Sequence, residues 1–336
     1  MTTPSISTTE LYTHIDTLIA TDTPLFIHGS PGIGKSYIVA DVAKKNNLEL
    51  VDVRLSQMDP VDLRGVPSIK DEQTLWMPPV FFPKDKDSSG ILFLDELNAA
   101  PPSVQAAIYQ LVLNRQMGEY MLPKGWRIIC AGNRVSDRGV VFRMPTPLAN
   151  RMVHLHVQAR FEDFKLFAIK SGLHKFVIGF LSFRPDLLST EPVVEDDANP
   201  AFATPRSYHM LSNILKAKES IKNITSIIYG TVGYSAGIEF VSYVKVYEEL
   251  PNIAAIYKGQ YPEIHNQPAL LYALVSALVE YYDGSDTHKE HLFAFSETLP
   301  TEFGVMLIKD IIVKDESLAT FGAFDTWLAK YGEYII

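Results

Sequence analysis

HGSPGIGKSY (residues 28–37) decides the fold, because glycine, lysine and serine occupy in it every fixed position of the pattern G-x-x-x-x-G-K-[ST]. Glycines at these positions let successive backbone N–H groups turn inward on phosphate oxygens. Lys35 adds a positive charge, and the Ser36 hydroxyl can ligate Mg²⁺. The predicted phosphate-binding residues are Gly29, Ser30, Pro31, Gly32, Ile33, Gly34, Lys35 and Ser36.

The segments on both sides of this loop have the periodicity that a phosphate loop requires. The apolar run PLFIHG (24–29) predicts a strand before the loop, and SYIVADVAKKN (36–46) has helical spacing after it. Four further segments predict strands: LELVDVRLS (48–56), ILFLDE (91–96), WRIICAGN (126–133) and MVHLHV (152–157). Because helical or mixed segments separate the five strands, we expect an α/β fold with an open, mostly parallel five-stranded sheet.

The length of the chain, 336 residues, exceeds what one ordinary core accommodates, so we expect two domains. The first, 1–158, contains the sheet. It is interrupted near 61–83 by a segment rich in proline and aromatic residues, which predicts a helix broken by a hairpin, and near 117–126 by a small predicted hairpin. After it the apolar spacing is largely helical, and we predict that 159–336 forms a mainly α-helical second domain.

Two adjacent acidic residues, Asp95 and Glu96, follow four apolar residues at the end of a predicted strand. At the sheet edge that carries the loop, Asp95 can hold Mg²⁺ and Glu96 can orient or deprotonate an attacking water. A solvent-exposed helix N-cap is the alternative for this pair. Asn133 ends the next predicted strand, where its amide can orient the water or bond a γ-phosphate oxygen. These residues together indicate hydrolysis rather than phosphoryl transfer to a bound acceptor.

The motifs GSPGIGKS, ILFLDELNAAPPSVQAAIYQLVLNR, IICAGNR, PLANRM and ATPRS, in this order, resemble the AAA+ ATPases and most closely their MoxR-like group. The resemblance covers about 30–210 and implies an AAA+ P-loop domain followed by a helical lid, with ATP and Mg²⁺ bound. Lys35 and Ser36 look like the Walker A lysine and magnesium ligand. Asp95 and Glu96 look like the Walker B metal-binding and catalytic acids.

The resemblance assigns three further residues. Asn133 matches sensor 1, and Arg206, at the start of a helix in the second domain, matches sensor 2. Arg151 matches the arginine finger, which in this family points into the nucleotide of the neighbouring subunit. A fixed guanidinium stabilises charge that builds on the transferred phosphoryl group, whereas a surface ion pair is the alternative for either arginine. Three arginines compete with Arg151 for the finger role: Arg134, Arg138 and Arg143.

The resemblance also implies an assembly and a task. A hexameric ring would hold ATP between adjacent subunits, and subunit movement on hydrolysis would remodel or mature a client protein, as chaperones do. A frequent partner in this group is a protein with a von Willebrand factor A domain. These expectations come from the resemblance and not from the residues themselves.

Two other functions are open to this sequence. A nucleic-acid motor needs basic pore loops, yet the net charge is −9 and the hairpin at 117–126 offers only Lys124 against Glu119. An interaction protein that binds ATP as a switch without hydrolysis is the second alternative. The presence of a loop lysine, a strand-end glutamate and a strand-end asparagine argues against it.

The remaining features indicate a soluble cytoplasmic protein. The N-terminal segment MTTPSISTTELYT lacks the basic and apolar parts of a secretory signal, and no apolar run approaches about 18 residues. Cys130 is the single cysteine, which excludes an internal disulfide. His154 and His156 share one face of a predicted strand, but no acidic residue or cysteine lies near them in the sequence, so we expect a structural role.

Overall fold

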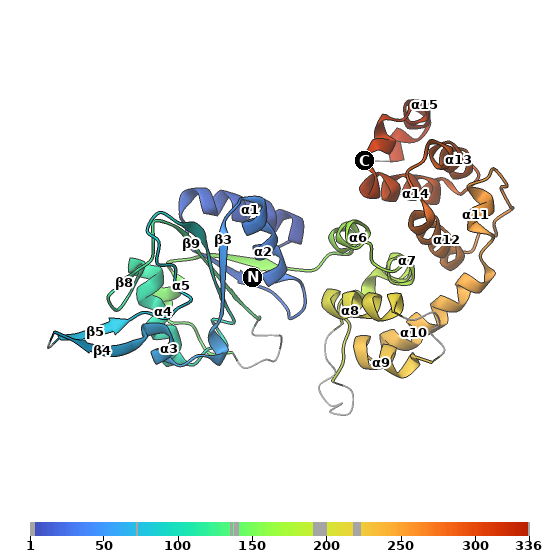
Figure 1. Cartoon of the computed structure of the whole chain (residues 1–336). Helices are drawn as coiled ribbons and strands as arrows, with labels where there is room; N and C mark the ends of the chain where they lie inside the picture. The colour runs from blue at the N-terminus through green and yellow to red at the C-terminus, as the bar shows by residue number, and fades with distance from the viewer. Residues whose placement is uncertain are drawn as a thin grey trace. The chain divides into compact units, whose positions relative to one another are not determined.

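The computed structural model describes residues 4–71, 73–134, 137, 141–190, 200–217 and 223–334. The chain divides into two units, Met1–Arg160 and Phe161–Ile336 (Figure 1). The first contains a parallel sheet and the second is helical, so the expectation of an α/β fold followed by a mainly α-helical part is confirmed. Within the described residues, no helix is long and apolar enough to cross a membrane.

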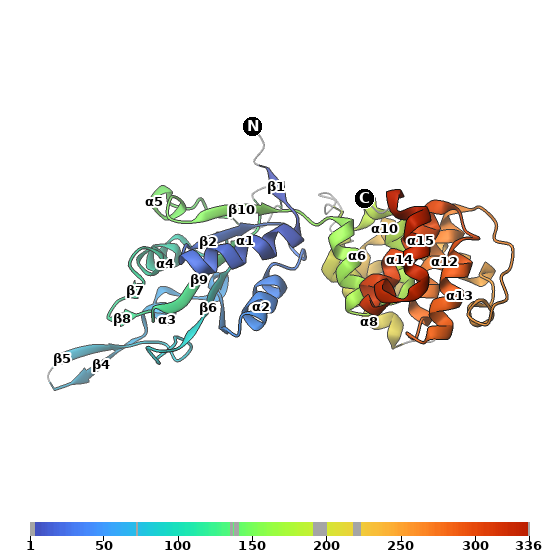
Figure 2. The ribbon, with the colours of Figure 1, turned by 90° about the horizontal axis from the view of Figure 1, so that it is seen from above.

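A single sheet organises the N-terminal unit. Its strands are β1 (Ser5–Ile6), β2 (Leu25–His28), β3 (Glu49–Arg54), β6 (Ser89–Asp95), β9 (Gly125–Gly132) and β10 (Val153–Val157). They lie in the order β1-β10-β2-β9-β6-β3, and every neighbouring pair is parallel (Figure 2). All five predicted strands are present, but the sheet has six, because β1 pairs with β10 although two residues are too few to show a strand pattern.

Helices and two hairpins connect these strands. The helical segments are α1 (Thr8–Thr21), α2 (Lys35–Lys45), η1 (Leu55–Gln57), α3 (Pro60–Arg64), α4 (Pro102–Asn114) and α5 (Thr146–Ala149). The hairpin strands are β4 (Val66–Lys70) with β5 (Gln73–Met77) and β7 (Gln116–Met117) with β8 (Tyr120–Met121). The insertion near 61–83 is therefore a short helix and a hairpin. The second hairpin lies earlier than the expected 117–126, because Gly125 and Trp126 already belong to β9.

Alternating side chains along the strands fill a core on each face of the sheet. From β2, Leu25 and Ile27 pack with apolar side chains of α1 and α2. Phe26, between them, points to the other face and packs with side chains of α4. Cover on both faces explains the nearly continuous apolar sequences of β2 and β6, since neither side of these strands meets water.

The strand order brings three chain segments to one edge of the sheet. The strands β2, β9 and β6 are consecutive and parallel, with His28 paired to Gly132 and Leu94 paired to Cys130. The loops that follow these strands therefore leave the sheet side by side. They carry the phosphate-loop motif, Asn133 and the acidic pair.

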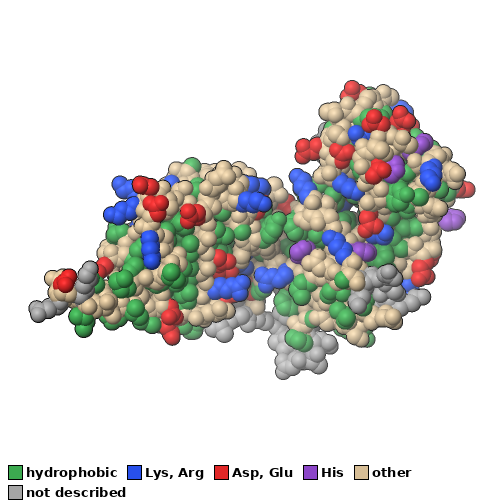
Figure 3. Space-filling model, in the orientation of Figure 1, with side chains coloured by type: hydrophobic (Ala, Val, Ile, Leu, Met, Phe, Trp, Pro, Cys, Tyr) green, Lys and Arg blue, Asp and Glu red, His purple; other side chains and the backbone are tan. Residues whose placement is uncertain are grey.

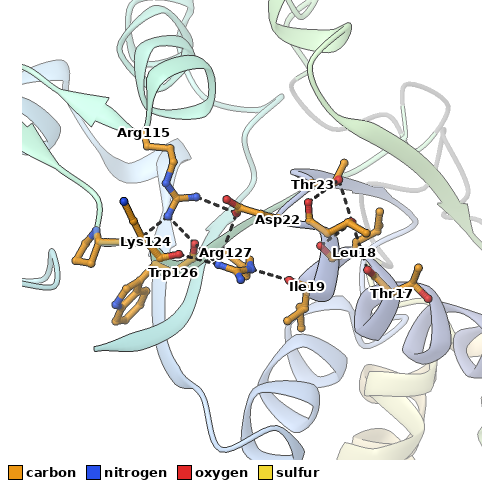
Figure 4. A network of polar contacts seen from close by, with 11 residues as sticks. Thr17, Leu18, Ile19, Asp22, Thr23, Arg115, Lys124, Trp126 and Arg127 are labelled. Atoms are coloured by element: carbon orange, nitrogen blue, oxygen red, sulfur yellow. Dashed lines mark hydrogen bonds and ion pairs between the residues drawn. The ribbon is translucent and has the colours of Figure 1, made fainter. Parts of the chain in front are cut away.

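The opposite edge is tied together by Asp22, as Figure 4 shows. The Asp22 carboxylate accepts a hydrogen bond from Arg115 Nη1 at 2.9 Å and lies 3.7 Å from Arg127 Nη1. Arg115 also donates to the carbonyl of Trp126 at 2.7 Å, and Arg127 Nε donates to that of Ile19 at 2.6 Å. These contacts join the ends of α1 and α4 to the start of β9.

The C-terminal unit consists of helices. Its α-helices are α6 (Phe161–Lys170), α7 (Lys175–Phe183), α8 (Pro205–Lys216), α9 (Thr225–Val232), α10 (Tyr234–Val244), α11 (Ile253–Ile256), α12 (Pro268–Tyr281), α13 (Asp286–Ser296), α14 (Thr301–Lys314) and α15 (Gly322–Tyr331). Short 3-10 turns are η3 (Pro185–Leu187), η4 (Lys245–Glu249), η5 (Glu316–Thr320) and η6 (Gly332–Tyr334). Helix α12 is buried over most of its length, because apolar side chains surround its axis.

A buried ion pair connects the first and the last part of this unit. Lys165 Nζ of α6 lies 2.8 Å from Asp310 Oδ1 of α14, and only 7% of Asp310 is exposed. Burial raises the pKa of the Asp310 carboxyl, and the Lys165 ammonium opposes this rise. The lysine therefore compensates much of the cost of desolvating this carboxylate, and Lys309 contributes to the same effect.

Replacing Lys165 with methionine should lower the free energy of unfolding of this unit by about 3–5 kcal/mol, because a buried carboxylate then loses its cation. Urea unfolding followed by far-UV circular dichroism measures the change. The matched control is Lys165→Met combined with Asp310→Asn, which removes both charges and should recover part of the loss. An unchanged unfolding midpoint in the single variant would contradict the assigned role of the pair.

Candidate active site

The phosphate-loop motif connects β2 to α2. Gly34 is the N-cap of α2 with φ +99°, a conformation that favours glycine. At Gly29 an added Cβ atom would lie 2.3 Å from Ile33 Cδ1 and 3.2 Å from the Val157 carbonyl oxygen, so the Ile33 side chain would have to shift. Ile33 itself is buried in the core beside α2. Gly29 and Gly34 thus allow the backbone conformation of the loop, and Ile33 anchors the loop to the core.

The Lys35 ammonium lies inside this loop. Its Nζ donates to the carbonyl oxygens of Gly29 at 2.6 Å and Ser30 at 3.1 Å, and to Asn133 Oδ1 at 3.2 Å. Only 9% of Lys35 is exposed. The lysine therefore links the loop to the residue that follows β9, and it brings together two residues that are 98 positions apart in the sequence.

Ser36 and Asp95 form the second contact between the loop and the strand ends. Ser36 Oγ donates to Asp95 Oδ2 at 3.1 Å, and Asp95 Oδ1 accepts from the Glu96 backbone N–H at 2.9 Å. A hydroxyl and a carboxylate oxygen on adjoining elements are the hard oxygen ligands that Mg²⁺ prefers. The donor set at this position therefore fits the predicted magnesium site.

The backbone leaves the direction of β6 at Glu96, the first residue after the strand. Its φ of +58° lies in the left-handed region, which is uncommon for a residue with a side chain. The Glu96 carboxylate accepts a hydrogen bond from the Ser56 hydroxyl, on the 3-10 turn η1 that follows β3. Sequence reasoning missed Ser56. Its place directly after a predicted strand was the available signal, but that signal does not reveal which strand lies beside β6.

Asn98 is a second residue that sequence reasoning missed. The side-chain Nδ2 of Asn98 donates to the backbone carbonyl of Asn133 at 2.7 Å. The backbone carbonyl of Asn98 accepts from the Phe142 N–H, also at 2.7 Å. Asn98 is buried, and it joins the turn after β6 to the backbone after β9. It therefore fixes the position of Asn133 relative to Asp95 and Glu96.

The arginines near this site differ in what they contact. Arg134 donates a hydrogen bond to Ser30 Oγ of the phosphate loop. Its Nη2 also forms an ion pair with Asp137 Oδ1, at 2.9 Å. Arg134 and Arg143 line a cavity of about 660 Å³ beside Asn133. Arg138 lies outside the described residues. Arg134 is thus engaged by the loop of its own chain.

Arg151 is exposed just after α5. Its Nη1 donates to the Pro147 carbonyl at 2.7 Å, and its guanidinium carbon lies 5.4 Å from the ring centre of Tyr109 on α4. Met152 beside it is buried. The side chain is therefore supported at its base by its own unit and presents its charge at the surface.

Arg206 belongs to the C-terminal unit, where it is the second residue of α8. Thr204 caps this helix, and a reciprocal pair of hydrogen bonds with Ser207 completes the cap. The Arg206 side chain is exposed. The helix start that carries it is thus well defined within its unit.

A pair of histidines connects the end of β2, directly before the phosphate loop, to β10. His28 Nε2 lies 2.8 Å from His154 Nδ1, and His154 Nε2 lies 2.8 Å from the Ala149 carbonyl oxygen. A carbonyl only accepts, so His154 Nε2 carries a proton. Burial, together with His156 and His154, lowers the pKa of His28 to about 3, so its ring is neutral at pH 7. In the contact between the two rings, one of these nitrogens donates and the other accepts, as the tautomers dictate.

Within the described residues, no group of three or more histidine, cysteine and acidic side chains has the geometry of a metal site. His156 stacks on His28, with ring centres 4.4 Å apart, and is thus a packing partner. Cys130 is buried in the core. The histidines of β10 therefore pack and hydrogen-bond inside the sheet.

The chain shows similarity to known proteins over its N-terminal unit. Residues 24–152 match the model of the AAA domain (dynein-related subfamily). Midasin of Giardia intestinalis is 31% identical over 142 residues, which are 40% of this chain and 3% of Midasin. The match supports an AAA+ ATPase domain in this part of the chain.

Among solved structures, NtrX of Brucella abortus in complex with ATP aligns with a TM-score of 0.40 and 17% identity, over 99% of this chain and 69% of NtrX. A K64R mutant of RuvB from Thermotoga maritima aligns with a TM-score of 0.39 and 14% identity, over 81% of this chain and 80% of RuvB.

Proposed function

We propose that the chain hydrolyses ATP in a Mg²⁺-dependent reaction and uses it to remodel or mature a client protein, as a MoxR-like AAA+ ATPase does. The observation that carries this proposal is the convergence at one sheet edge of the Lys35 ammonium, the Ser36–Asp95 pair and the Asn133 amide. A loop that only held phosphate would need no acidic pair beside it. The pair adds a place for a metal ion and for a base.

In this proposal the loop backbone and Lys35 bind the β- and γ-phosphates, and the start of α2 adds its positive end. Ser36 and Asp95 hold Mg²⁺, which when bound neutralises negative charge on the phosphate oxygens. Lys35 Nζ already lies between the loop carbonyls and Asn133 Oδ1, so few rearrangements are needed for it to contact a phosphate.

Glu96 accepts the proton of the attacking water, and Asn133 orients that water or the γ-phosphate. The Ser56 hydroxyl holds the Glu96 carboxylate through one hydrogen bond, which fixes its direction. Asn98 fixes the backbone of Asn133. The proton acceptor and the orienting amide are thus each held by a neighbour that does not itself touch the phosphates.

Two arginines, Arg151 and Arg206, complete the proposed site, in addition to the residues at the sheet edge. Arg151, exposed beyond α5, acts on the nucleotide of the adjacent subunit in a hexameric ring. Arg206, at the start of α8, contacts the nucleotide from a helical lid, with 1–158 as the nucleotide domain and 159–336 as the lid. The exposure of both guanidinium groups supports roles outside their own unit's core.

The client-facing surface in this proposal includes the β4–β5 hairpin. Val66, Ile69 and Met77 on it are largely exposed, and Figure 3 shows hydrophobic side chains gathered over this region. An exposed apolar group of this kind is typical of a protein interaction site. A protein with a von Willebrand factor A domain is the partner that the MoxR-like assignment proposes.

Isothermal titration with ATP and Mg²⁺ tests the nucleotide site. Wild type should bind, and Lys35→Ala should bind about 10- to 100-fold more weakly, because charge-assisted contacts of one ammonium are lost. Lys44→Ala, on the exposed far end of the same helix, is the matched control and should bind as wild type does. Equal affinities in wild type and Lys35→Ala would contradict the assignment of the loop.

A further inference from the structure

A chain of two hydrogen bonds connects His28, the residue before Gly29, to the segment of Arg151. It starts at His28, whose neighbour Gly29 gives its carbonyl to the Lys35 ammonium. It passes through His154 on β10 and ends on the Ala149 carbonyl, with 2.8 Å at each of its two contacts. The chain thereby connects β2 to β10, across 126 positions of sequence, and β10 to α5, which directly precedes it.

The far end of this chain closes the turn that holds Arg151. Ala149 is the last residue of α5, and its carbonyl also accepts the Met152 N–H at 3.3 Å. Arg151 lies between these two residues and donates back to Pro147 at 2.7 Å. The orientation of the Ala149 peptide therefore sets the path of the backbone from which the Arg151 side chain leaves.

The middle of the chain is held by ring contacts. The centre of the His28 ring lies 4.3 Å from that of Phe26 and 4.4 Å from that of His156, and His28 and His156 also line the cavity beside Asn133. The strands that carry the two histidines are paired in register, with His154 beside Phe26 and His156 beside His28. Because His28 directly precedes Gly29, a displacement of the loop backbone at Gly29 moves the His28 ring, and His154 must follow it or lose the bond.

We propose that His154 is a positioning residue for Arg151, and that the His28–His154–Ala149 chain couples the state of one subunit's phosphate loop to the arginine that this subunit offers to its neighbour. This rests on the proposed function, which gives Arg151 its role. The alternative is that both histidines only pack the sheet. The proposal predicts that hydrogen exchange in α5 changes when the loop binds nucleotide, through His154. A role in packing alone predicts no such dependence on His154.

Hydrogen exchange measured by mass spectrometry on the assembled full chain separates them. In wild type, a slowly hydrolysed ATP analogue with Mg²⁺ should slow exchange both in 29–40 and in 144–152. In His154→Phe, the loop segment should still respond, and the response of 144–152 should fall by at least about half. His156→Phe is the matched control, because it keeps the ring stack without belonging to the hydrogen-bonded chain, and both segments should respond.

The possible failures are distinguishable. If 29–40 does not respond in wild type, the proposed function fails, and the inference with it. If 29–40 responds while 144–152 does not, or if 144–152 responds equally in His154→Phe, the coupling alone is overturned.

A double-mutant cycle gives an independent readout through kinetics. His154→Phe should lower kcat about 10-fold without changing KM, and should add no further loss to Arg151→Ala, because it acts through that residue. His154→Gln, which can both donate and accept, should recover most of the rate. Losses that multiply in the double variant, or a raised KM for ATP with a lowered melting temperature, would assign His154 a merely structural role.

Discussion

Arg151→Ala should lower kcat for ATP hydrolysis by about 1,000-fold or more, because an arginine that stabilises the charge on a transferred phosphoryl group contributes that much to the rate. ATP affinity should change little, since Lys35, Ser36 and Asp95 belong to the variant's own site and are untouched. Steady-state phosphate release and ATP titration measure the two quantities. Arg143→Ala, at the competing arginine beside the cavity, should retain most of the wild-type rate.

Mixing two inactive variants tests whether Arg151 acts in the site of the neighbouring subunit. Arg151→Ala subunits have an intact phosphate loop, and Lys35→Ala subunits have an intact arginine. A mixed ring contains interfaces where an intact loop faces an intact arginine, so phosphate release should rise when one inactive variant is titrated into the other. Absence of recovery, with mixed rings confirmed by native mass spectrometry, would contradict a role in the neighbouring site.

Glu96→Gln should lower kcat by about 100- to 10,000-fold, because the amide keeps the shape of the side chain but cannot accept the proton of the attacking water. The Kd for ATP should stay within about threefold of wild type, since the residue does not hold the phosphates. The variant should therefore accumulate the ATP-bound assembly, and a client that binds this state should co-purify with it.

The matched control for this variant is Glu119→Gln in the loop between β7 and β8, which carries the same chemical change at an exposed position. Its rate should equal that of wild type. A Glu96→Gln variant with the wild-type rate would remove Glu96 from the reaction and leave the acidic pair with a structural role at the strand end.

Much of this site was predictable because parallel strands have a simple rule. All strands of a parallel sheet end at the same edge, so the residues that follow the strands ending at His28, Asp95 and Gly132 were expected at one edge without knowledge of the strand order. The phosphate-loop spacing supplied the remaining local constraint. Five of the six strands of this sheet were predicted. ILFLDE was recognisable because a strand covered on both faces has a distinctive composition, and LELVDVRLS because its apolar residues alternate.

The missed contacts depend on which strands become neighbours, and no local pattern contains that information. Ser56 reaches Glu96 only because β3 lies beside β6. His28 reaches His154 only because β10 pairs with β2 across 126 positions of sequence. The two-residue strand β1 was missed for a different reason, since its pairing with β10 does not depend on a pattern of its own.

The function proposed for this site is ATP hydrolysis at an interface between subunits. It is tested by steady-state phosphate release from the wild-type chain, measured with saturating ATP and Mg²⁺ over a range of chain concentrations. We expect release far above that of Glu96→Gln, with a rate per chain that rises as subunits assemble. Release no faster than that of Glu96→Gln at every concentration would contradict it.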